Sequence, residues 1–336
     1  MKNIKRILIT GVAGLIGTHL SRYFLDKGYE ISGIDDLSGG YKENIDDRLI
    51  KSMKFAEINL IDSKALEGAF KELKPDFVYH LAAYAAEGLS PFIRNYNYTN
   101  NILASVNVIN ECIKNDVQKM VFTSSMAVYG IGIPPFTEDQ PLSPIDPYGI
   151  AKYSVEQDLK QAYNQFGLKY TIIRPHNIIG IYQNIWDKYR NVIGIWIHNI
   201  LNNQPILIYG DGLQRRAFSD IKYYMEPFEK VMNNFNGEIF NIGADQDYSI
   251  LEIALLLKDI SGKHGYECFI EHREPRHEVS VAYCDHTKAK DLLNFKDDTI
   301  LRDLIEKMFM WAKDQPERSV KIMNYELDKG IYSYWK

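Results

Sequence analysis

The amino-acid sequence predicts an α/β fold with a doubly wound parallel sheet and a smaller α/β lobe built from the C-terminal part. Three observations lead to this prediction. Short apolar strands alternate with helical stretches through the first half, a glycine-rich turn joins the first strand to the first helix, and this rhythm ends after Pro175. At 336 residues the chain is long enough for one large domain or two closely joined ones.

The strands expected in the first half are short and apolar, and helical stretches lie between most of them. The strands are expected at Arg6–Thr10, Glu30–Ile34, Lys54–Glu57, Phe77–Leu81, Lys119–Ser124 and Tyr170–Arg174, and the helices at Ile16–Lys27, Lys64–Lys74, Tyr98–Asn115 and Tyr148–Phe166. Pro75 fits a helix that ends just before the fourth strand. Apolar strands that alternate with helices form parallel sheets from βαβ units.

The second half has a different texture, with more aromatic residues, asparagines and glycines. One more strand and helix are expected at Glu238–Ile242 and Ser249–Ile260, and a terminal helix at Thr299–Lys313. We therefore expect a first domain over residues 1–175, rejoined by a strand and helix near residues 217–258, and a second lobe over residues 176–336. A ligand cleft is expected between the two.

Composition excludes several classes of protein. A net charge of −5 gives no electrostatic footprint for nucleic acid or for an anionic membrane surface. The three cysteines are scattered and lack metal-ligand spacing, which favours a reducing compartment without disulfides and predicts no metal site.

The short apolar run after the first residues is broken by glycines, which argues against a signal peptide. No run approaches the roughly 18 apolar residues of a membrane span, so a soluble, cytoplasmic protein is expected.

The glycine turn lies between the first strand and the first helix. Gly11, Gly14 and Gly17 allow a tight turn, a close approach of the backbone to a ligand, and a helix that lies close to the sheet. The freed N–H groups at the helix start form an anion site suited to a pyrophosphate. On its own, this GxxGxxG spacing also fits a helix that merely packs on a strand.

An acid follows the second strand, at about the 20-residue distance where a Rossmann-type fold binds the adenosine ribose. Asp35 occupies this position and Asp36 comes next. A carboxylate there repels the 2′-phosphate of NADP, so the sequence favours NAD. Taken alone, Asp35 also fits an ordinary loop aspartate.

Two later stretches carry groups suited to proton transfer. Ser124 and Ser125 follow a buried strand, and Tyr148 and Lys152 are four residues apart at a helix start, so they share one face. A free phenol has a pKa of about 10 and is a poor base at neutral pH, but a nearby ammonium and a cationic nicotinamide ring favour the phenolate. A YxxxK pair is common by chance, and its meaning comes from its place after the glycine turn, the acid and the serines.

In this order of motifs the chain resembles the extended short-chain dehydrogenase/reductase family, and within it the NAD-dependent nucleotide-sugar epimerases and dehydratases. The resemblance covers nearly the whole chain. The matching residues are Gly11, Gly14 and Gly17, the His80–Ala83 run, Asn100 and Asn101, Ser124 and Ser125 with Tyr129 and Gly130, Tyr148 and Lys152, the Arg174–Asn177 run, and the Tyr209–Gly212 run with Arg216 and Phe218.

The resemblance implies a role for each matching position. Tyr148 would be the acid/base, Lys152 would hold the nicotinamide ribose and tune Tyr148, and Ser125 would orient the sugar hydroxyl. The implied NAD-binding residues are Gly11, Gly14, Leu15, Ile16, Gly17, Asp35, Asp36, Asn59, Leu60, Leu81, Ala82, Ala83, Asn101, Ser124, Tyr148, Lys152 and Pro175. The implied substrate-binding residues are Ser125, Met126, Asn177, Asn191, Val192, Ile208, Tyr209, Arg216, Arg276 and Glu278. Arg273 also lies near the expected place of the arginine that closes over the diphosphate.

Departures from the family pattern bear on the reaction. Dehydratases carry an acid just after the serine or threonine at the strand end, where this chain has Met126 and Ala127. Elimination of water needs a proton donor and a base, so a NAD-dependent nucleotide-sugar epimerase is expected, with a UDP-hexose 4-epimerase as the leading case. Ala85 replaces a lysine near the cofactor phosphates, which leaves a one-way dehydrogenase open, as well as a dehydratase without the acidic pair. A dinucleotide-sensing protein without chemistry is the alternative from another class.

Three further features stay open at this level. The resemblance implies a homodimer joined through the helices Tyr98–Asn115 and Tyr148–Phe166, but the apolar stripe of Ile102, Val106, Ile109 and Ile113 also fits a face that lies on the sheet. The Asn184–Arg190 stretch resembles a pocket wall, while Trp186 and Trp196 also fit packing within the small lobe. His176 fits a structural histidine better than a catalytic one.

Overall fold

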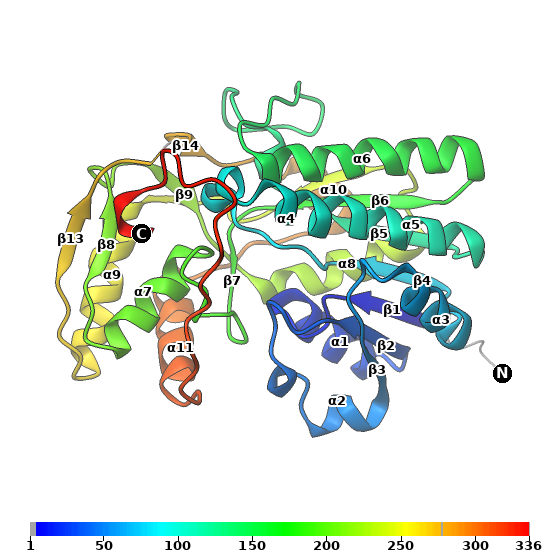
Figure 1. The fold of residues 1–336 in the computed structure, drawn as a ribbon. Coiled ribbons are helices and arrows are strands. Elements are labelled where there is room, and N and C mark those ends of the chain that lie inside the picture. The colour runs from blue at the N-terminus through cyan, green and yellow to red at the C-terminus, as the bar shows by residue number, and fades with distance from the viewer. Residues whose placement is uncertain (1–4, 277, 336) are drawn as a thin grey trace.

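The computed structural model describes residues 5–276 and 278–335, and its centre is a parallel sheet. The strands are β1 (Arg6–Thr10), β2 (Glu30–Asp35), β3 (Met53–Glu57), β4 (Phe77–His80), β5 (Lys119–Thr123), β6 (Tyr170–Pro175) and β11 (Ile239–Ile242). This seven-stranded sheet has the order β11-β6-β5-β4-β1-β2-β3, and every neighbouring pair is parallel. The predicted parallel sheet is confirmed (Figure 1), and β11 returns to it from far along the chain to pair with β6.

Helices cover both faces of the sheet because alternate strand residues point to opposite sides. On one face Ile7 and Ile9 of β1 pack with α1 (Leu15–Asp26), α8 (Met225–Asn233) and α10 (Thr287–Leu293). On the other face Leu8 packs with α3 (Ser63–Leu73), α5 (Ala104–Lys114) and α6 (Pro147–Phe166). The sheet is therefore doubly wound, and the crevice at the reversal of strand order between β1 and β4 is where such folds bind ligands.

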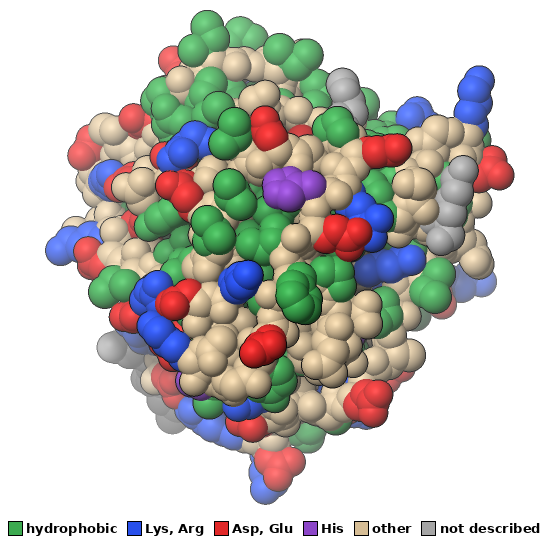
Figure 2. Space-filling view, turned by 90° about the vertical axis from the view of Figure 1, so that its left-hand side faces the viewer, with side chains coloured by type: hydrophobic (Ala, Val, Ile, Leu, Met, Phe, Trp, Pro, Cys, Tyr) green, Lys and Arg blue, Asp and Glu red, His purple; other side chains and the backbone are tan. Residues whose placement is uncertain are grey.

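The smaller lobe has a hydrophobic core of its own. Helices α7 (Val192–Leu201), α9 (Ile250–Lys263) and α11 (Leu301–Lys313) pack with the parallel pair of β8 (Ile206–Tyr209) and β13 (Ile270–Arg273). A three-stranded sheet holds β9 (Arg215–Ala217) between β12 (Asp247–Ser249) and β14 (Val281–Ala282). A short pair, β7 (Ile178–Ile179) and β10 (Ser219–Asp220), completes the strands that the structure describes. Lysine, arginine and acidic side chains are interspersed on the outer face of this lobe (Figure 2), as is typical of a solvated surface.

The helix predicted over Tyr98–Asn115 is divided in the structure. It consists of α4 (Arg94–Tyr98), a π-helical turn over Thr99–Leu103, and α5. The short helix α2 (Asp47–Ser52) precedes β3 and was not predicted. Within the part of the chain that the structure describes, no helix is long and apolar enough to cross a membrane.

The segment after α11 crosses back from the small lobe to the first lobe (Figure 1). The Glu326 carboxylate accepts the N–H groups of Asn95 and Tyr96 at 2.7 and 2.8 Å, at the start of α4. Ile331 and Trp335 pack in a separate cluster with residues that follow β4, including Tyr84 and Leu89. The C-terminal segment therefore ties the two lobes together beside the crevice.

Candidate active site

A cavity of about 800 Å³ extends from the carboxyl ends of the sheet strands into the small lobe. The predicted cofactor residues that line it are Gly11, Gly14, Leu15, Ile16, Gly17, Asp35, Asp36, Asn59, Leu60, Leu81, Ala82, Ala83, Ser124, Tyr148, Lys152 and Pro175. The predicted substrate residues that line it are Ser125, Met126, Asn177, Asn191, Val192, Tyr209, Arg216, Arg276 and Glu278. Residues predicted from separate motifs thus share one cavity.

The glycine turn forms one end of this cavity. Gly11 has a φ of +72°, and a Cβ there would lie 2.8 Å from the Ala82 nitrogen, so only glycine fits between β1 and the end of β4. Gly14 is the N-cap of α1 and provides no side-chain hydrogen bond to the first turn, which also carries no acid. The N–H groups at this helix start are left without a side-chain cap, and the turn therefore fits the pyrophosphate of a dinucleotide.

Asp35 lies at the end of β2, beside this turn. Its carboxylate accepts the Ala13 N–H at 2.9 Å and the Leu37 N–H at 2.8 Å. Burial raises the pKa of Asp35, and these two hydrogen bonds oppose the rise. Each carboxylate oxygen keeps a further lone pair for a ribose hydroxyl. Next to it, the Asp36 carboxylate accepts from the Asn59 amide at 3.0 Å, which holds together two residues expected around the adenosine.

Gly17 offers a direct test of the turn. A Cβ at this position would lie 2.3 Å from the Gly11 carbonyl oxygen and 2.6 Å from the Val12 Cα, which are both backbone atoms. We expect Gly17→Ala to weaken NAD binding at least about tenfold and to lower the free energy of unfolding by about 1–3 kcal/mol, because overpacking must displace the turn. NAD titration by fluorescence and urea unfolding measure the two effects.

Gly68 provides the matched control for that substitution. It lies within α3, and a Cβ there would meet nothing within 4 Å. Gly68→Ala should leave NAD binding unchanged and should stabilise the helix by up to about 1 kcal/mol. Equal NAD affinities for the two variants would contradict the role assigned to Gly17.

The catalytic candidates meet where α6 begins, near the end of β5. Asp146 caps α6 by accepting the Gly149 N–H at 2.9 Å, and Pro147 begins the helix, so Tyr148 and Lys152 fall on its first two turns. The Lys152 ammonium donates to the Thr123 carbonyl at 2.8 Å and lies 5.9 Å from the centre of the Tyr148 ring. The Ser125 hydroxyl accepts the Ala127 N–H at 3.1 Å and lies close enough to the Tyr148 hydroxyl to lower its pKa. The predicted cluster of Ser125, Tyr148 and Lys152 is thus assembled.

The pKa values in this cluster differ from the expectation that a nearby ammonium favours the phenolate of Tyr148. Burial and the charge of Glu87 raise the pKa of Tyr148, and the hydrogen bond with Ser125 only partly opposes them. Burial also lowers the pKa of Lys152, to about 7. In the protein alone, desolvation therefore has the largest effect on both groups, and the cation that lowers the pKa of Tyr148 is Arg190. A cationic nicotinamide ring beside Tyr148 would shift the balance toward the phenolate.

The small-lobe wall carries polar groups suited to a nucleoside diphosphate. The Nδ2 atom of Asn191, at the start of α7, is buried and has no hydrogen-bond partner among the described residues. Arg216 donates to the Glu278 carboxylate at 2.7 Å and to the Val279 carbonyl at 2.8 Å. Asn177, with a φ of +41°, donates to the Ala217 carbonyl at 2.9 Å. Asn191 thus offers a free donor, whereas Arg216 and Glu278 are paired with each other.

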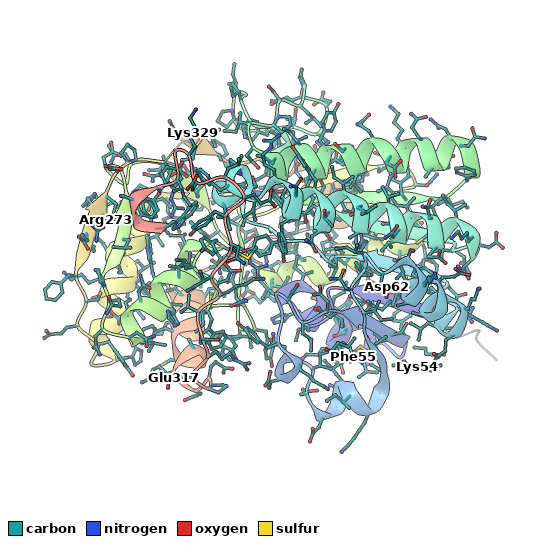
Figure 3. The ribbon with its side chains drawn as sticks, in the orientation of Figure 1. Lys54, Phe55, Asp62, Arg273, Glu317 and Lys329 are labelled. Atoms are coloured by element: carbon teal, nitrogen blue, oxygen red, sulfur yellow. The ribbon has the colours of Figure 1, made fainter. Side chains whose placement is uncertain are left out.

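Of the two arginines expected near the diphosphate, Arg276 lines the cavity. Its guanidinium lies 3.5 Å from the centre of the Tyr209 ring, and its Nε donates to the Tyr334 hydroxyl at 2.9 Å. Arg273 does not line the cavity; it pairs with Glu271 and lies at the outer margin of the small lobe (Figure 3). The C-terminal aromatics Tyr334 and Trp335, which hold Arg276, are missing from the sequence prediction. Only the aromatic density of the last residues hinted at them.

Two predicted site residues do not line the cavity. Asn101 is predicted to contact the cofactor, but its side chain is buried and exchanges hydrogen bonds of 2.8 and 3.1 Å with the backbone of Tyr84. Ile208 is predicted to contact the substrate, but it packs in the core of the small lobe. Residues alternate along β8, so Leu207 and Tyr209 face the cavity instead.

The structure also places the aromatic and histidine candidates, and Asn184, Tyr189 and Arg190 of the predicted Asn184–Arg190 stretch line the cavity. Trp186 packs in the small-lobe core and does not line the cavity, whereas Trp196 belongs to that core and also lines the cavity. His176 lines the cavity and is tied to His286 through their Nε2 atoms, 2.6 Å apart. Burial and the nearby His286 hold the pKa of His176 well below its usual range. The histidine pair was not anticipated.

Comparison with known proteins decides the family. The model of the NAD dependent epimerase/dehydratase family matches residues 7–243, which span the sheet, the glycine turn and the catalytic candidates. The chain belongs to this family. The resemblance inferred from the motifs is confirmed, and so is NAD as the cofactor.

Individual relatives agree across almost the whole chain. A putative UDP-glucose 4-epimerase of Methanocaldococcus jannaschii is 32% identical over 313 residues, which are 92% of this chain and 98% of the relative. The structure of the Thermotoga maritima UDP-glucose 4-epimerase with UDP-glucose has a TM-score of 0.85 at 29% identity and covers 92% of this chain and 98% of its own. A Bacillus cereus UDP-glucuronic acid 4-epimerase with UDP-glucuronic acid and NAD has a TM-score of 0.82 at 27% identity, covering 92% and 99%. The predicted α/β fold is confirmed at this level as well.

Proposed function

We propose that this protein is a NAD-dependent UDP-hexose 4-epimerase. The observation that carries the proposal is the cluster of Ser125, Tyr148 and Lys152 in the cavity that the glycine turn also lines. The family relationship and the UDP-sugar 4-epimerases among the relatives support it. The cavity residues predicted for NAD and for the substrate are proposed to bind the two molecules side by side.

In this proposal each catalytic side chain has one task. Tyr148 takes the proton of the sugar C4 hydroxyl as the C4–H bond breaks, and it returns the proton when hydride comes back to the other face. Ser125 bonds both to Tyr148 and to the reacting oxygen, and Lys152 stabilises the phenolate. NAD, when bound, supplies the hydride acceptor and donor. The 4-keto sugar must turn over between the two hydride transfers, and the reaction involves no net redox change.

Of the alternatives within the family, the dehydratase needs groups that this chain lacks at the expected place. Met126 and Ala127 follow Ser125, and neither can move a proton, which disfavours a dehydratase. Ala85 leaves a one-way dehydrogenase as the second candidate, because cofactor retention is weaker without the lysine that many epimerases have there. A sensing protein has no need of a buried tyrosine and lysine pair beside the cofactor.

We further propose a cytoplasmic homodimer joined through α5 and α6. Leu103 precedes α5 and Ile150 lies on α6, and these apolar side chains are 47% and 40% exposed. Ile109 and Ile113 of the predicted stripe pack on the sheet, so they do not belong to the proposed contact. The three cysteines are free and buried, which fits a reducing compartment. A monomer mass in light scattering at micromolar concentration would rule the dimer out.

The function is tested with a panel of UDP-, GDP-, CDP- and dTDP-sugars, followed by NMR of the products. We expect a UDP-hexose to yield its C4 epimer without loss of water and without accumulation of NADH. A 4-keto-6-deoxy product would replace the proposal with a dehydratase, and stoichiometric NADH would replace it with a dehydrogenase.

A further inference from the structure

Glu87 begins a 3₁₀ segment, Glu87–Phe92, that forms the cavity wall between the catalytic tyrosine and Arg276. On one side the Ser90 hydroxyl donates to the Glu87 carbonyl at 2.8 Å and accepts the Tyr148 N–H at 3.2 Å. On the other side a Cβ on Gly88 would lie 3.9 Å from the guanidinium of Arg276. The backbone at Glu87 is therefore fixed between the group that acts at C4 and a group suited to the diphosphate.

The Glu87 side chain is open to the cavity and carries an unpaired carboxylate. It makes no hydrogen bond or ion pair with the residues that the structure describes. The titratable groups around it are Asp146 and Tyr148 of the catalytic helix start, Arg216 and Glu278 of the small lobe, and Arg276 beside Gly88. Desolvation within the cavity, followed by the charge of Asp146, raises the pKa of Glu87. The charge of Arg216 only partly offsets this rise.

The cations that line the cavity are largely committed elsewhere. Among the described lining residues, the lysine and arginine side chains are Lys152, Arg190, Arg216 and Arg276. Lys152 donates to a carbonyl, while Arg190 and Arg216 pair with Asp187 and Glu278. Arg276 is left for the diphosphate. A second anionic group on the sugar would therefore meet Glu87 without a free cation to neutralise it.

A hexose held between Tyr148 and Arg276 passes alongside Glu87. Its hydroxyl groups can donate to the carboxylate, whereas the carboxylate of a hexuronate would face a like charge at close range. We propose that Glu87 is a specificity-determining residue, which accepts hydrogen bonds from the hydroxyls of neutral UDP-hexoses and excludes UDP-hexuronates. This inference rests on the proposed function and names the substrate class of the same site.

The test compares kcat/KM for UDP-glucose and UDP-glucuronate in the wild-type protein and in Glu87→Gln. Glutamine keeps the size and the acceptor oxygen but removes the charge. Like charges placed together strongly disfavour a wrong partner, so we expect the ratio of uronate to hexose kcat/KM to rise at least about tenfold in Glu87→Gln. Glu67→Gln is the control, because Glu67 also carries a negative charge but lies on α3 outside the cavity. It should leave the ratio unchanged.

The wild-type protein gives a second measurement that needs no variant to fold. Neutral Glu87 tolerates a uronate and ionised Glu87 repels it, while the uronate itself stays ionised because carboxyl groups ordinarily titrate at about pH 4. The uronate-to-hexose ratio should therefore fall as the pH rises through about 7, where Glu87 titrates. A ratio that changes neither with pH nor in Glu87→Gln, or a wild-type preference for the uronate, would overturn the inference.

Failure of the proposed function is distinguishable from failure of this inference. If no UDP-hexose is epimerised, the function is wrong, and displacement of a fluorescent UDP derivative by UDP-glucose and UDP-glucuronate still measures the selectivity. Weaker displacement by the uronate that is relieved in Glu87→Gln would support the role of Glu87. Equal displacement by both sugars would contradict it.

Discussion

Replacing Tyr148 with phenylalanine is expected to lower kcat for UDP-hexose epimerisation by about 10²–10⁴-fold, the usual contribution of a positioned acid/base group. The substitution removes only the hydroxyl, whose pKa the neighbouring Ser125 lowers. The ring stays and keeps its contacts, so NAD affinity and the unfolding midpoint should change little. Stopped-flow or NMR rates, together with NAD titration, measure the two sides of this expectation.

Tyr163→Phe is the matched control because it removes a tyrosine hydroxyl from the same helix. Tyr163 lies on α6 and is 40% exposed, away from the cavity. Its replacement should leave kcat within about twofold of the wild-type value, as expected for a surface change. A Tyr148→Phe protein with wild-type turnover would mean that another group moves the proton.

The sheet could be predicted from sequence because each strand is marked by its own short apolar run. The strand Arg6–Thr10 coincides with the prediction, and Phe77–Leu81 and Lys119–Ser124 each run one residue past the observed ends. Strand ends of this kind depend on the partner strands, which a single strand does not reveal. The π-helical turn over Thr99–Leu103 escaped prediction for a related reason. Its Asn101 bonds to the backbone of Tyr84, a contact outside the helix.

In the candidate site, too, features fixed by local spacing could be predicted and contacts between distant residues could not. The glycine turn and the Tyr148–Lys152 pair were predictable because a fixed spacing on one turn or one helix face determines their geometry. The aromatic support of Arg276 was not predictable, because Tyr334 is 58 residues further along the chain and meets Arg276 only after folding. Ile208 was predictable in principle: strand alternation puts it on the face opposite to Tyr209.

Breaking the buried ion pair between Arg174 and Glu156 is expected to have the largest effect on the free energy of unfolding. Arg174 of β6 donates to both carboxylate oxygens of Glu156 on α6, at 2.9 and 2.6 Å, and the two side chains are 2% and 1% exposed. Glu156→Ala leaves the guanidinium buried without its partner, so we expect the free energy of unfolding to fall by about 3–5 kcal/mol. Urea unfolding followed by circular dichroism measures the loss.

Glu67→Ala is the comparison for an exposed pair, since Glu67 meets Lys71 one turn away on the surface of α3. Such pairs contribute about 0.3–0.5 kcal/mol, so this variant should unfold almost as the wild-type protein does. The double variant Glu156→Met with Arg174→Met removes both charges. It should recover part of the stability lost in Glu156→Ala, because the cost lies in the unpaired charge rather than in the absence of the pair. No recovery would mean that Glu156 acts mainly through another contact.

That other contact connects the ion pair to the active site. Glu156 also accepts the hydroxyl hydrogen of Ser124, the neighbour of Ser125, while Arg174 donates to the Tyr129 hydroxyl at 2.9 Å. The pair thus joins the end of β5, the strand β6 and the helix that carries Tyr148 and Lys152. If it positions Ser125, any remaining folded Glu156→Ala protein should show a lower kcat with a nearly unchanged NAD affinity. A purely stabilising pair would leave kcat per folded molecule at its wild-type value.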